Sequence, residues 1–313
     1  MARRAARKRS ANAANSLSAT QRALGALRRR QQTLAAQQLA LQRRQWRESR
    51  QIAQSTIRAA RVSGSPILRI LCEGDSWMRY DCGIGVMSNV QWQLGQRAAC
   101  LNLATSGDTM VNMMKLPARA ELDRQLRSGI EGAPWDALIF SGGGNDVAGD
   151  EFVDWLLPYA GQKNPADAIA QPRFNTLLAE LASLYGELAS RVHSYSPSTL
   201  VLLNAYDFAI PTGKGVPFAG PWLAPGFTAR GYDVTSLAFR TQVVKLLLLQ
   251  FAAMLRDVGK VYPFMKLMPT QGLLKRNEWA NELHPTDAGF RRVASVFLRE
   301  LNAIMHSRAA AAR

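Results

Sequence analysis

The chain has 313 residues, of which 47% are hydrophobic and 8% aromatic, so it is long enough to bury a sizeable core. Three cysteines without a C-x-x-C pair argue against a disulfide framework or a cysteine-based zinc site. The sequence contains no uncharged apolar run of about 18 residues, so we expect no transmembrane helix. The apolar stretch 23–27 is too short for a secretory signal. We therefore expect a cytoplasmic protein, either free or peripheral to a membrane.

The net charge of +16 is concentrated at the start of the chain. Residues 1–61 hold 15 of the 39 Lys and Arg residues and one acid, which gives them +14. Their abundance of Ala, Gln, Arg and Leu, without Pro, predicts a basic helical arm over 1–62. A partial heptad of leucines suits a coiled-coil partner, and the charge suits an anionic membrane surface; nucleic acid is the less favoured partner. The leucines are Leu17, Leu24, Leu27, Leu34 and Leu41.

From Pro66 onward, apolar runs alternate with segments of helical periodicity. The runs predict strands at 67–73, 99–105, 135–142, 198–206 and 260–266. The segments between them predict helices at about 86–98, 111–128, 173–194 and 234–257. A last helix is expected to begin near Thr286, as its N-cap, and to run to about Met305. This alternation predicts a parallel sheet with helices on both faces, in a domain over 63–313.

The segment 207–231 interrupts this alternation. It is rich in Pro, Gly and aromatic residues and is too long for a passive connection. We expect it to be a lid or a binding loop.

Chemically distinctive residues follow the first three predicted strands. The first strand is followed by G-D-S-W with Ser76, the second by T-S-G-D with Gly107, and the third by G-G-G-N with Asn145. Ligands of parallel sheets bind beyond the carboxyl ends of the strands, where these residues are expected to meet. A fourth stretch, N-E-L-H-P with His284, lies just before the last helix.

These residue types suit acyl transfer. A serine hydroxyl is a weak nucleophile until a base takes its proton, and His284 can do so near neutral pH. The oxyanion of such a reaction needs preorganised donors, which the backbone N–H of Ser76 or Gly107 and the amide of Asn145 can supply. The chemistry uses no cofactor and no metal.

Four of these stretches resemble the blocks of the SGNH (GDSL) hydrolase superfamily and occur in the same order over about residues 67–303. They are G-D-S-W, Gly107, G-G-N-D and H-P. The resemblance implies a flavodoxin-like three-layer α/β/α sandwich around five parallel strands. It also implies that Ser76 is the nucleophile, that His284 is the base, and that Gly107 and Asn145 complete the oxyanion hole.

One residue departs from the family pattern. The family usually has Asp three positions before the histidine, where this chain has Asn281. An amide oxygen can accept the imidazole N–H but lacks the charge that stabilises imidazolium. Three alternatives follow: Asn281 orients the histidine, which we favour; another acid, Glu282, Asp233 or Asp207, does so; or the serine and histidine act as a dyad.

The leading hypothesis is a serine esterase of the lipase and lysophospholipase class, acting on a small-molecule or lipid ester. The apolar side chains of the insertion favour an apolar acyl group over a bare acetyl. They are Phe208, Phe218, Trp222, Leu223 and Phe227. The alternative is a catalytically inactive scaffold or binding protein, tethered by the basic arm to membrane, nucleic acid or a partner helix.

Overall fold

The computed structural model describes residues 2–80, 85–217 and 219–311, without the side chains of 2–29 and of positions 31, 35, 150, 309 and 311. The chain divides into two compact units, Met1–Glu48 and Ser49–Arg313. All strands of the described residues belong to the second unit.

The predicted basic arm is part of one helix, α1 (Ala2–Ser63). Its last turns belong to the second unit, which begins at Ser49 and not at the predicted residue 63. Ala53 and Ile57 are fully buried there, and the Ser49 hydroxyl accepts the Asn102 N–H at 2.9 Å. Buried side chains at helical spacing therefore place the end of the helix in the domain. Binding of residues 1–61 to an anionic surface or a partner helix stays a prediction.

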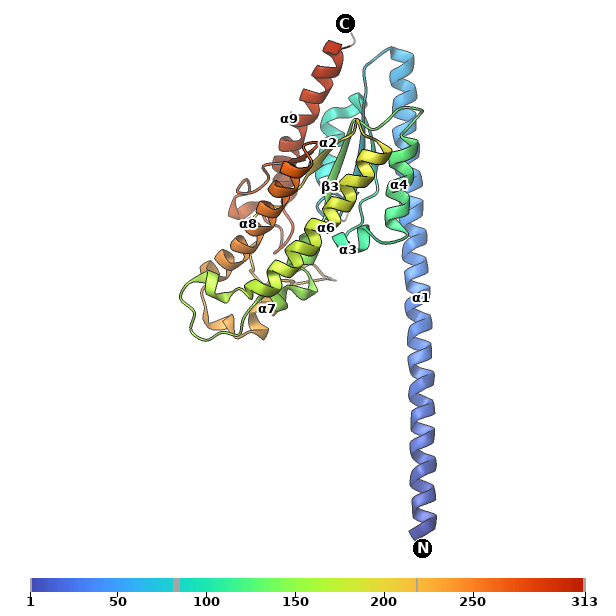
Figure 1. Ribbon diagram of the computed structural model, residues 1–313, viewed down its shortest axis with the longest axis vertical. Helices are drawn as coiled ribbons and strands as arrows, with labels where there is room; N and C mark the ends of the chain where they lie inside the picture. The colour runs from blue at the N-terminus through green and yellow to red at the C-terminus, as the bar shows by residue number, and fades with distance from the viewer. Residues whose placement is uncertain (1, 81–84, 218, 312–313) are drawn as a thin grey trace. The chain divides into compact units, whose positions relative to one another are not determined.

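Five parallel strands form one sheet in the order β2-β1-β3-β4-β5. The central strand, β3, is labelled in Figure 1. The strands are β1 (Leu68–Gly74), β2 (Ala98–Asn102), β3 (Ala137–Ser141), β4 (Leu200–Leu203) and β5 (Met265–Leu267). This order is flavodoxin-like, so the predicted fold class is confirmed. The direction of winding reverses between β1 and β3, which is where such sheets open a crevice for ligands.

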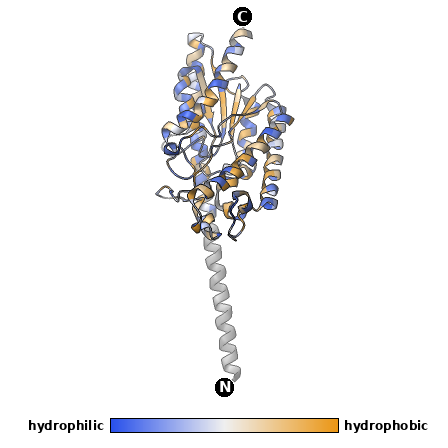
Figure 2. Cartoon of the chain, turned by 90° about the vertical axis from the view of Figure 1, so that its left-hand side faces the viewer, coloured by the Kyte–Doolittle hydropathy of each residue, from blue (hydrophilic) through white to orange (hydrophobic). Residues whose placement is uncertain are grey.

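Helices cover both faces of the sheet, whose own ribbon is largely hydrophobic (Figure 2). On one face α2 (Val86–Leu94) packs against α9 (Asp287–Ala311). On the other, α4 (Ala118–Ser128) packs against α6 (Gln171–Tyr195), and α6 against α8 (Leu237–Val261). The connection from β1 to β2 runs toward one edge of the sheet, and those from β3 to β4 and β5 run toward the other. Because such connections are right-handed, their helices lie on opposite faces of the sheet. The Thr286 hydroxyl accepts the Gly289 N–H at 3.2 Å, so the predicted N-cap of α9 is confirmed.

Short helices complete the chain. Those with α geometry are α3 (Met110–Met113), α5 (Gly144–Ala148) and α7 (Ala224–Ala229). Those with 3-10 geometry are η2 (Gly95–Arg97), η3 (Asp150–Trp155), η4 (Pro165–Ala168), η5 (Tyr232–Val234) and η6 (Arg276–Glu278). Among the described helices, α8 alone has the length and apolar composition to cross a membrane, and here it packs against α6 and β5 as a core helix does.

Most predicted elements differ from the observed ones at their ends, and for two of them a proline or a buried side chain gives the reason. The predicted helix at 111–128 is two helices, α3 and α4, because Pro117 lies between them and lacks the N–H that would continue the first. The predicted strand at 260–266 is shorter, because α8 continues past the buried Val258 and ends just before Pro263. Only the last residues of that run pair with β4.

Candidate active site

Ser76 lies in the turn that follows β1, at the carboxyl edge of the sheet. The chain can turn here because Gly74 passes close to Ser141 of β3. A β-carbon at position 74 would lie 2.8 Å from the Ser141 carbonyl oxygen, closer than side chains are found. A residue with a side chain would therefore push the Ser76 turn away from the sheet.

The buried carboxylate of Asp75 holds this turn in place. It accepts hydrogen bonds from the Trp77 N–H at 3.0 Å, the Ser141 hydroxyl at 3.2 Å and the Tyr206 hydroxyl at 2.6 Å. Burial raises the pKa of Asp75 to about 7. The bond from Trp77 closes the turn, and the bonds from Ser141 and Tyr206 connect it to other parts of the chain, so Asp75 fixes the shape of the turn that carries Ser76.

His284 lies between Ser76 and Asn281. Its Nε2 is 2.8 Å from Ser76 Oγ, and its Nδ1 is 3.0 Å from Asn281 Oδ1. Asn281 Oδ1 also accepts the backbone N–H groups of Leu283 and His284, while Nδ2 donates to the Tyr80 hydroxyl. The backbone donors determine which way the amide is turned, because a reversed amide would place its NH₂ against them. The amide oxygen therefore faces the ring.

Two aromatic side chains enclose the His284 ring. Tyr80 stacks on it with centroids 4.2 Å apart, and Trp222 of the insertion contacts it edge-on at 5.5 Å. Burial lowers the pKa of His284 to about 4, so the ring is neutral at pH 7 and able to accept a proton. Sequence reasoning missed Tyr80, although its place four residues after Ser76, on the same turn, is a usable signal.

The indole of Trp77 connects the serine turn to the histidine loop. Its Nε1 donates to the Leu283 carbonyl at 3.1 Å, and its rings pack edge-on against Tyr206 and Phe290. Because Leu283 immediately precedes the histidine, this bond fixes the approach of His284 to Ser76.

Asn145 reaches the site from the first turn of α5. Gly143, at φ +91°, makes the left-handed turn that begins this helix. Asn145 Nδ2 donates to the Asp108 carbonyl at 2.7 Å, and its second hydrogen has no partner among the described residues. Asn145 and Ser76 line the same pocket, whose described lining does not include Gly107. Gly107, at φ +79°, lies one residue before the carbonyl that Asn145 binds.

The carboxylate of Glu282 is fully buried and binds the insertion. It accepts four backbone N–H groups at 2.7 to 3.1 Å, and the Glu282 N–H donates to the Lys214 carbonyl. The four donors are Gly213, Trp222, Leu223 and Ala224. Glu282 therefore binds both ends of the segment 213–224 of the insertion to the histidine loop.

The two other candidate acids are also engaged elsewhere. Asp207 accepts the backbone N–H groups of Phe208, Gly272 and Leu274 at 2.6 to 2.7 Å. Asp233 is exposed and accepts the Thr228 hydroxyl. These bonds stabilise loops, and none of them is made to His284, although Asp207 lines the same pocket as the histidine.

The pocket beside Ser76 has mostly apolar walls. Its free space is about 30 Å³, whereas one water molecule needs about 10–15 Å³, so it holds a group of a few heavy atoms. Besides Ser76, Asn145 and His284, the lining includes Trp77, Ala148, Tyr206, Ala209, Leu248 and Leu283.

The apolar side chains of the insertion lie in different environments. Trp222 lies against His284, whereas Leu223 and Phe227 are fully buried, Phe227 against Phe152. The Phe208 ring has the Lys245 ammonium 5.0 Å above it. Phe218 lies outside the described residues. Of the four described aromatic and leucine side chains in this set, Trp222 is the one that contacts a catalytic side chain.

The cysteines and the acids form no cluster at the site. Within the described ranges, no three His, Cys, Asp or Glu side chains come together in a way that would hold a metal ion. Cys72 and Cys100 are buried free thiols, and Cys82 lies outside the described residues.

Comparison with known proteins gives similarity at the level of structure. No family model matches the sequence, and no curated protein is similar to it. The lipase Lip_vut3 from goat rumen metagenome is a similar structure, with a TM-score of 0.47 at 15% identity over 76% of this chain and 97% of that one.

Two further similar structures come from bacteria. A carbohydrate acetylesterase family member from Sinorhizobium meliloti has a TM-score of 0.47 at 15% identity, over 77% of this chain and 100% of that one. Phospholipase A1 from Streptomyces albidoflavus NA297 has a TM-score of 0.45 at 17% identity, over 76% and 99%. At such identity, the roles of the residues have to be inferred from this chain's own site.

Proposed function

We propose that this chain is a serine esterase that hydrolyses carboxylic esters through Ser76 and His284. The observation that supports this most directly is the hydrogen-bonded series Ser76 Oγ, His284 and Asn281 Oδ1, with distances of 2.8 and 3.0 Å. A nucleophile, a base within reach of its proton, and an acceptor that orients the base are the parts that acyl transfer needs.

The first half of the reaction forms an acyl-serine. Ser76 Oγ attacks the ester carbonyl while His284 Nε2 takes the hydroxyl proton, and the tetrahedral adduct then expels the alcohol, which receives that proton from the ring. In the second half, His284 takes a proton from water as the water attacks the acyl-serine, and returns it to Ser76 as the acid leaves. The neutral ring, whose pKa burial lowers to about 4, is the form that starts each half.

The developing oxyanion needs donors that are already in position. The second amide hydrogen of Asn145 is one, because the Asp108 carbonyl holds the side chain at 2.7 Å while it lines the pocket. The backbone N–H groups of Ser76 and Gly107 are the others in this proposal. The bond between Asn145 and Asp108 connects the amide to the loop that carries Gly107.

Asn281 is the proposed orienting residue for His284. Its oxygen accepts Nδ1–H, which selects the tautomer with an unprotonated Nε2 facing Ser76. The three candidate acids make their hydrogen bonds to other parts of the chain. Because an amide does not neutralise the imidazolium, we expect a slower enzyme than one with Asp at this position.

The proposed substrate is an ester with a short apolar acyl group. The walls around Ser76 are mostly apolar, but the free space of about 30 Å³ accommodates only a few heavy atoms. The insertion predicted an apolar acyl group, and the size of the pocket requires that this group be short.

The test is turnover of p-nitrophenyl acetate, butyrate and octanoate by the purified full chain. We expect the two shorter esters to be hydrolysed with the higher kcat/KM, and Ser76→Ala to abolish turnover with an unchanged thermal unfolding midpoint. Ser183→Ala, at an exposed serine of α6, is the matched control and should be as active as the wild type. Turnover that survives in Ser76→Ala would refute the proposal, and no turnover by the wild-type chain would favour a non-catalytic scaffold.

A further inference from the structure

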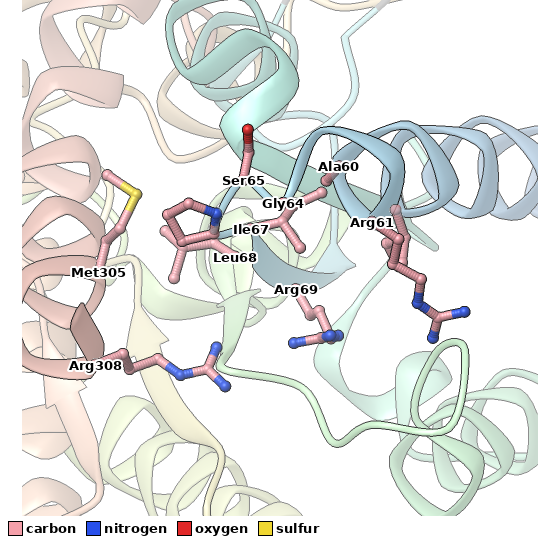
Figure 3. Close-up of a pocket in the computed structure, with 11 residues that line it drawn as sticks. Ala60, Arg61, Gly64, Ser65, Ile67, Leu68, Arg69, Met305 and Arg308 are labelled. Carbon is pink, nitrogen blue, oxygen red and sulfur yellow. The ribbon is translucent and has the colours of Figure 1, made fainter. Parts of the chain in front are cut away.

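A second pocket lies at the opposite end of β1 from Ser76. It is formed by the end of α1, the linker 64–67, the start of β1 and the end of α9 (Figure 3). The seven residues of β1 separate it from the Ser76 turn by on the order of 20 Å, at about 3.3 Å per residue. An ester bound at Ser76 therefore does not reach this pocket.

The pocket has an apolar wall and a volume suited to a small ligand. Its volume is about 390 Å³, within the range of about 300–1,000 Å³ that is typical of ligand pockets. The side chains of Ile57, Ala60, Ile67, Leu68 and Met305 form the apolar part. Such a wall binds hydrocarbon and repels a bare inorganic ion.

Three arginines from three different elements border the same pocket: Arg61 of α1, Arg69 of β1 and Arg308 of α9. In Figure 3 their guanidinium groups extend to the side away from Ser65 and Met305. Arginine binds carboxylate and phosphate groups through paired N–H donors, so this arrangement suits an anionic headgroup.

The acids nearby are already occupied. Asp136 binds Arg308 through Oδ1 and the Arg69 backbone N–H through Oδ2 at 2.7 Å. Glu131 pairs with Arg61 at 3.4 Å and with Arg58 at 3.7 Å. Two carboxylates therefore face four guanidinium groups, which leaves a local excess of two positive charges.

Arg69 is the pocket arginine that forms no ion pair within 4 Å among the described residues. Its Nε is buried and has no hydrogen-bond partner within the described parts of the chain. Burial lowers the pKa of Arg69, and the positive charges of Arg308 and Arg61 lower it further, against the opposing effect of Asp136. An anion in the pocket would reduce the repulsion among the three arginines, whose charges the two nearby carboxylates do not balance.

We propose that this pocket binds an anionic amphiphile, a carboxylate or phosphate headgroup on a short hydrocarbon chain. The headgroup contacts Arg69 and Arg308, and the chain lies against Ile57, Leu68 and Met305. Because α1 and α9 both contribute to the pocket, the ligand also holds the end of α1 against the sheet. The site is separate from the proposed esterase site and does not depend on it.

The proposal is tested by calorimetric titration of the full chain with four probes: octyl phosphate, octanoate, octanol and inorganic phosphate. We expect one octyl phosphate or octanoate to bind per chain, and octanol and inorganic phosphate to bind at least tenfold more weakly. Comparing the two octyl anions identifies the preferred headgroup. If octanol binds as tightly as the anions, or inorganic phosphate as tightly as octyl phosphate, the amphiphile proposal is overturned.

Variants locate the binding site. Arg69→Met keeps the length and apolar stem of the side chain but removes its charge, and should weaken octyl phosphate binding at least tenfold. Arg308→Met, at a half-exposed position, should do the same and provides the test if Arg69→Met does not fold. The control is Arg299→Met, at an exposed position of α9, which should bind as the wild type does. Ser76→Ala should also bind normally; unchanged binding in both pocket variants would assign the ligand to another site.

Discussion

Replacing Glu282 with Gln is predicted to release the insertion from the histidine loop. In the native chain Oε1 accepts the N–H groups of Gly213 and Ala224, and Oε2 accepts those of Trp222 and Leu223. A glutamine amide has one oxygen, so whichever way it turns, its NH₂ group faces two N–H donors. The substitution therefore removes two of the four hydrogen bonds and leaves donors opposed to one another.

The expected cost follows from these contacts. A hydrogen bond to a charged group contributes about 1.5–3 kcal/mol, so losing two destabilises the docked insertion by about 3–6 kcal/mol. The insertion is a peripheral segment, so we expect most of this change as local opening, in which the sheet stays folded. Since about 1.4 kcal/mol corresponds to a factor of ten, the open state becomes at least about 10²-fold more populated.

Native-state hydrogen exchange measures this opening directly. The amides of Gly213, Trp222, Leu223 and Ala224 should exchange at least about 10²-fold faster in Glu282→Gln. Because Trp222 packs on His284, kcat/KM for p-nitrophenyl butyrate should fall as well. Glu180→Gln, at an exposed glutamate of α6, is the control. Unchanged protection of the four amides would refute the proposed hold of Glu282 on the insertion. If kcat fell while the protection stayed unchanged, Glu282 would instead be the residue that orients His284.

Further predictions concern the catalytic side chains and the domain boundary. Asn281→Asp should preserve or raise kcat, because a carboxylate accepts the same Nδ1–H from His284 and its second oxygen accepts the Tyr80 hydroxyl. Asn281→Ala should lower kcat. Equal rates in the wild type and both variants would indicate that Ser76 and His284 act as a dyad. Asn145→Ala should lower kcat by about 10²–10³ with little change in KM, and a change confined to KM would limit Asn145 to substrate binding. Burial lowers the pKa of His284 to about 4, so kcat/KM should stay level from pH 7 to about pH 5 and fall below pH 4, where the ring is protonated; a fall centred at pH 6.5 would contradict this. The unfolded chain takes up that proton at about pH 6.5, so the contribution of His284 lowers the unfolding free energy as pH falls from 6.5 to 4. A fragment of residues 63–313 should be less stable in urea than one of 49–313 by at least about 2 kcal/mol, because it loses the buried Ile57 side chain, and equal midpoints and slopes would refute this.

The sheet could be predicted because its signals are local. Each buried strand is a short apolar run followed by a glycine or polar turn, and each helix between them has an apolar face. The carboxyl ends of β1 and β3 meet at the switch point, so the order of the stretches containing Ser76 and Asn145 was enough to expect the two side chains near each other. Their common pocket agrees with that expectation.

The features that the sequence did not predict depend on distant contacts. The Glu282 carboxylate binds N–H groups 58 to 69 residues earlier in the chain, and no local pattern marks such a bond. The end of α1 was assigned to the arm because its composition continues that of the preceding turns, yet Ala53 and Ile57 are buried by the domain. Helical periodicity identifies an apolar face, but it does not say whether that face meets the chain's own sheet or another partner.

The histidine loop shows why neighbouring residues of similar chemistry have different effects. Asn281 and Glu282 are adjacent, and both present oxygens, but Asn281 turns toward His284 while Glu282 turns toward the insertion. The charge is therefore on the residue that holds the insertion, where four N–H donors stabilise it, and the neutral amide faces the base. A carboxylate in the protein interior needs such donors, whereas the amide next to His284 is satisfied by Tyr80 and two backbone groups. Displacement of the insertion therefore affects His284 in two ways. It removes the contact of Trp222 with the His284 ring, and it moves Glu282, which lies on the same short loop as the histidine. We therefore expect opening of the insertion and the alignment of His284 with Ser76 to change together.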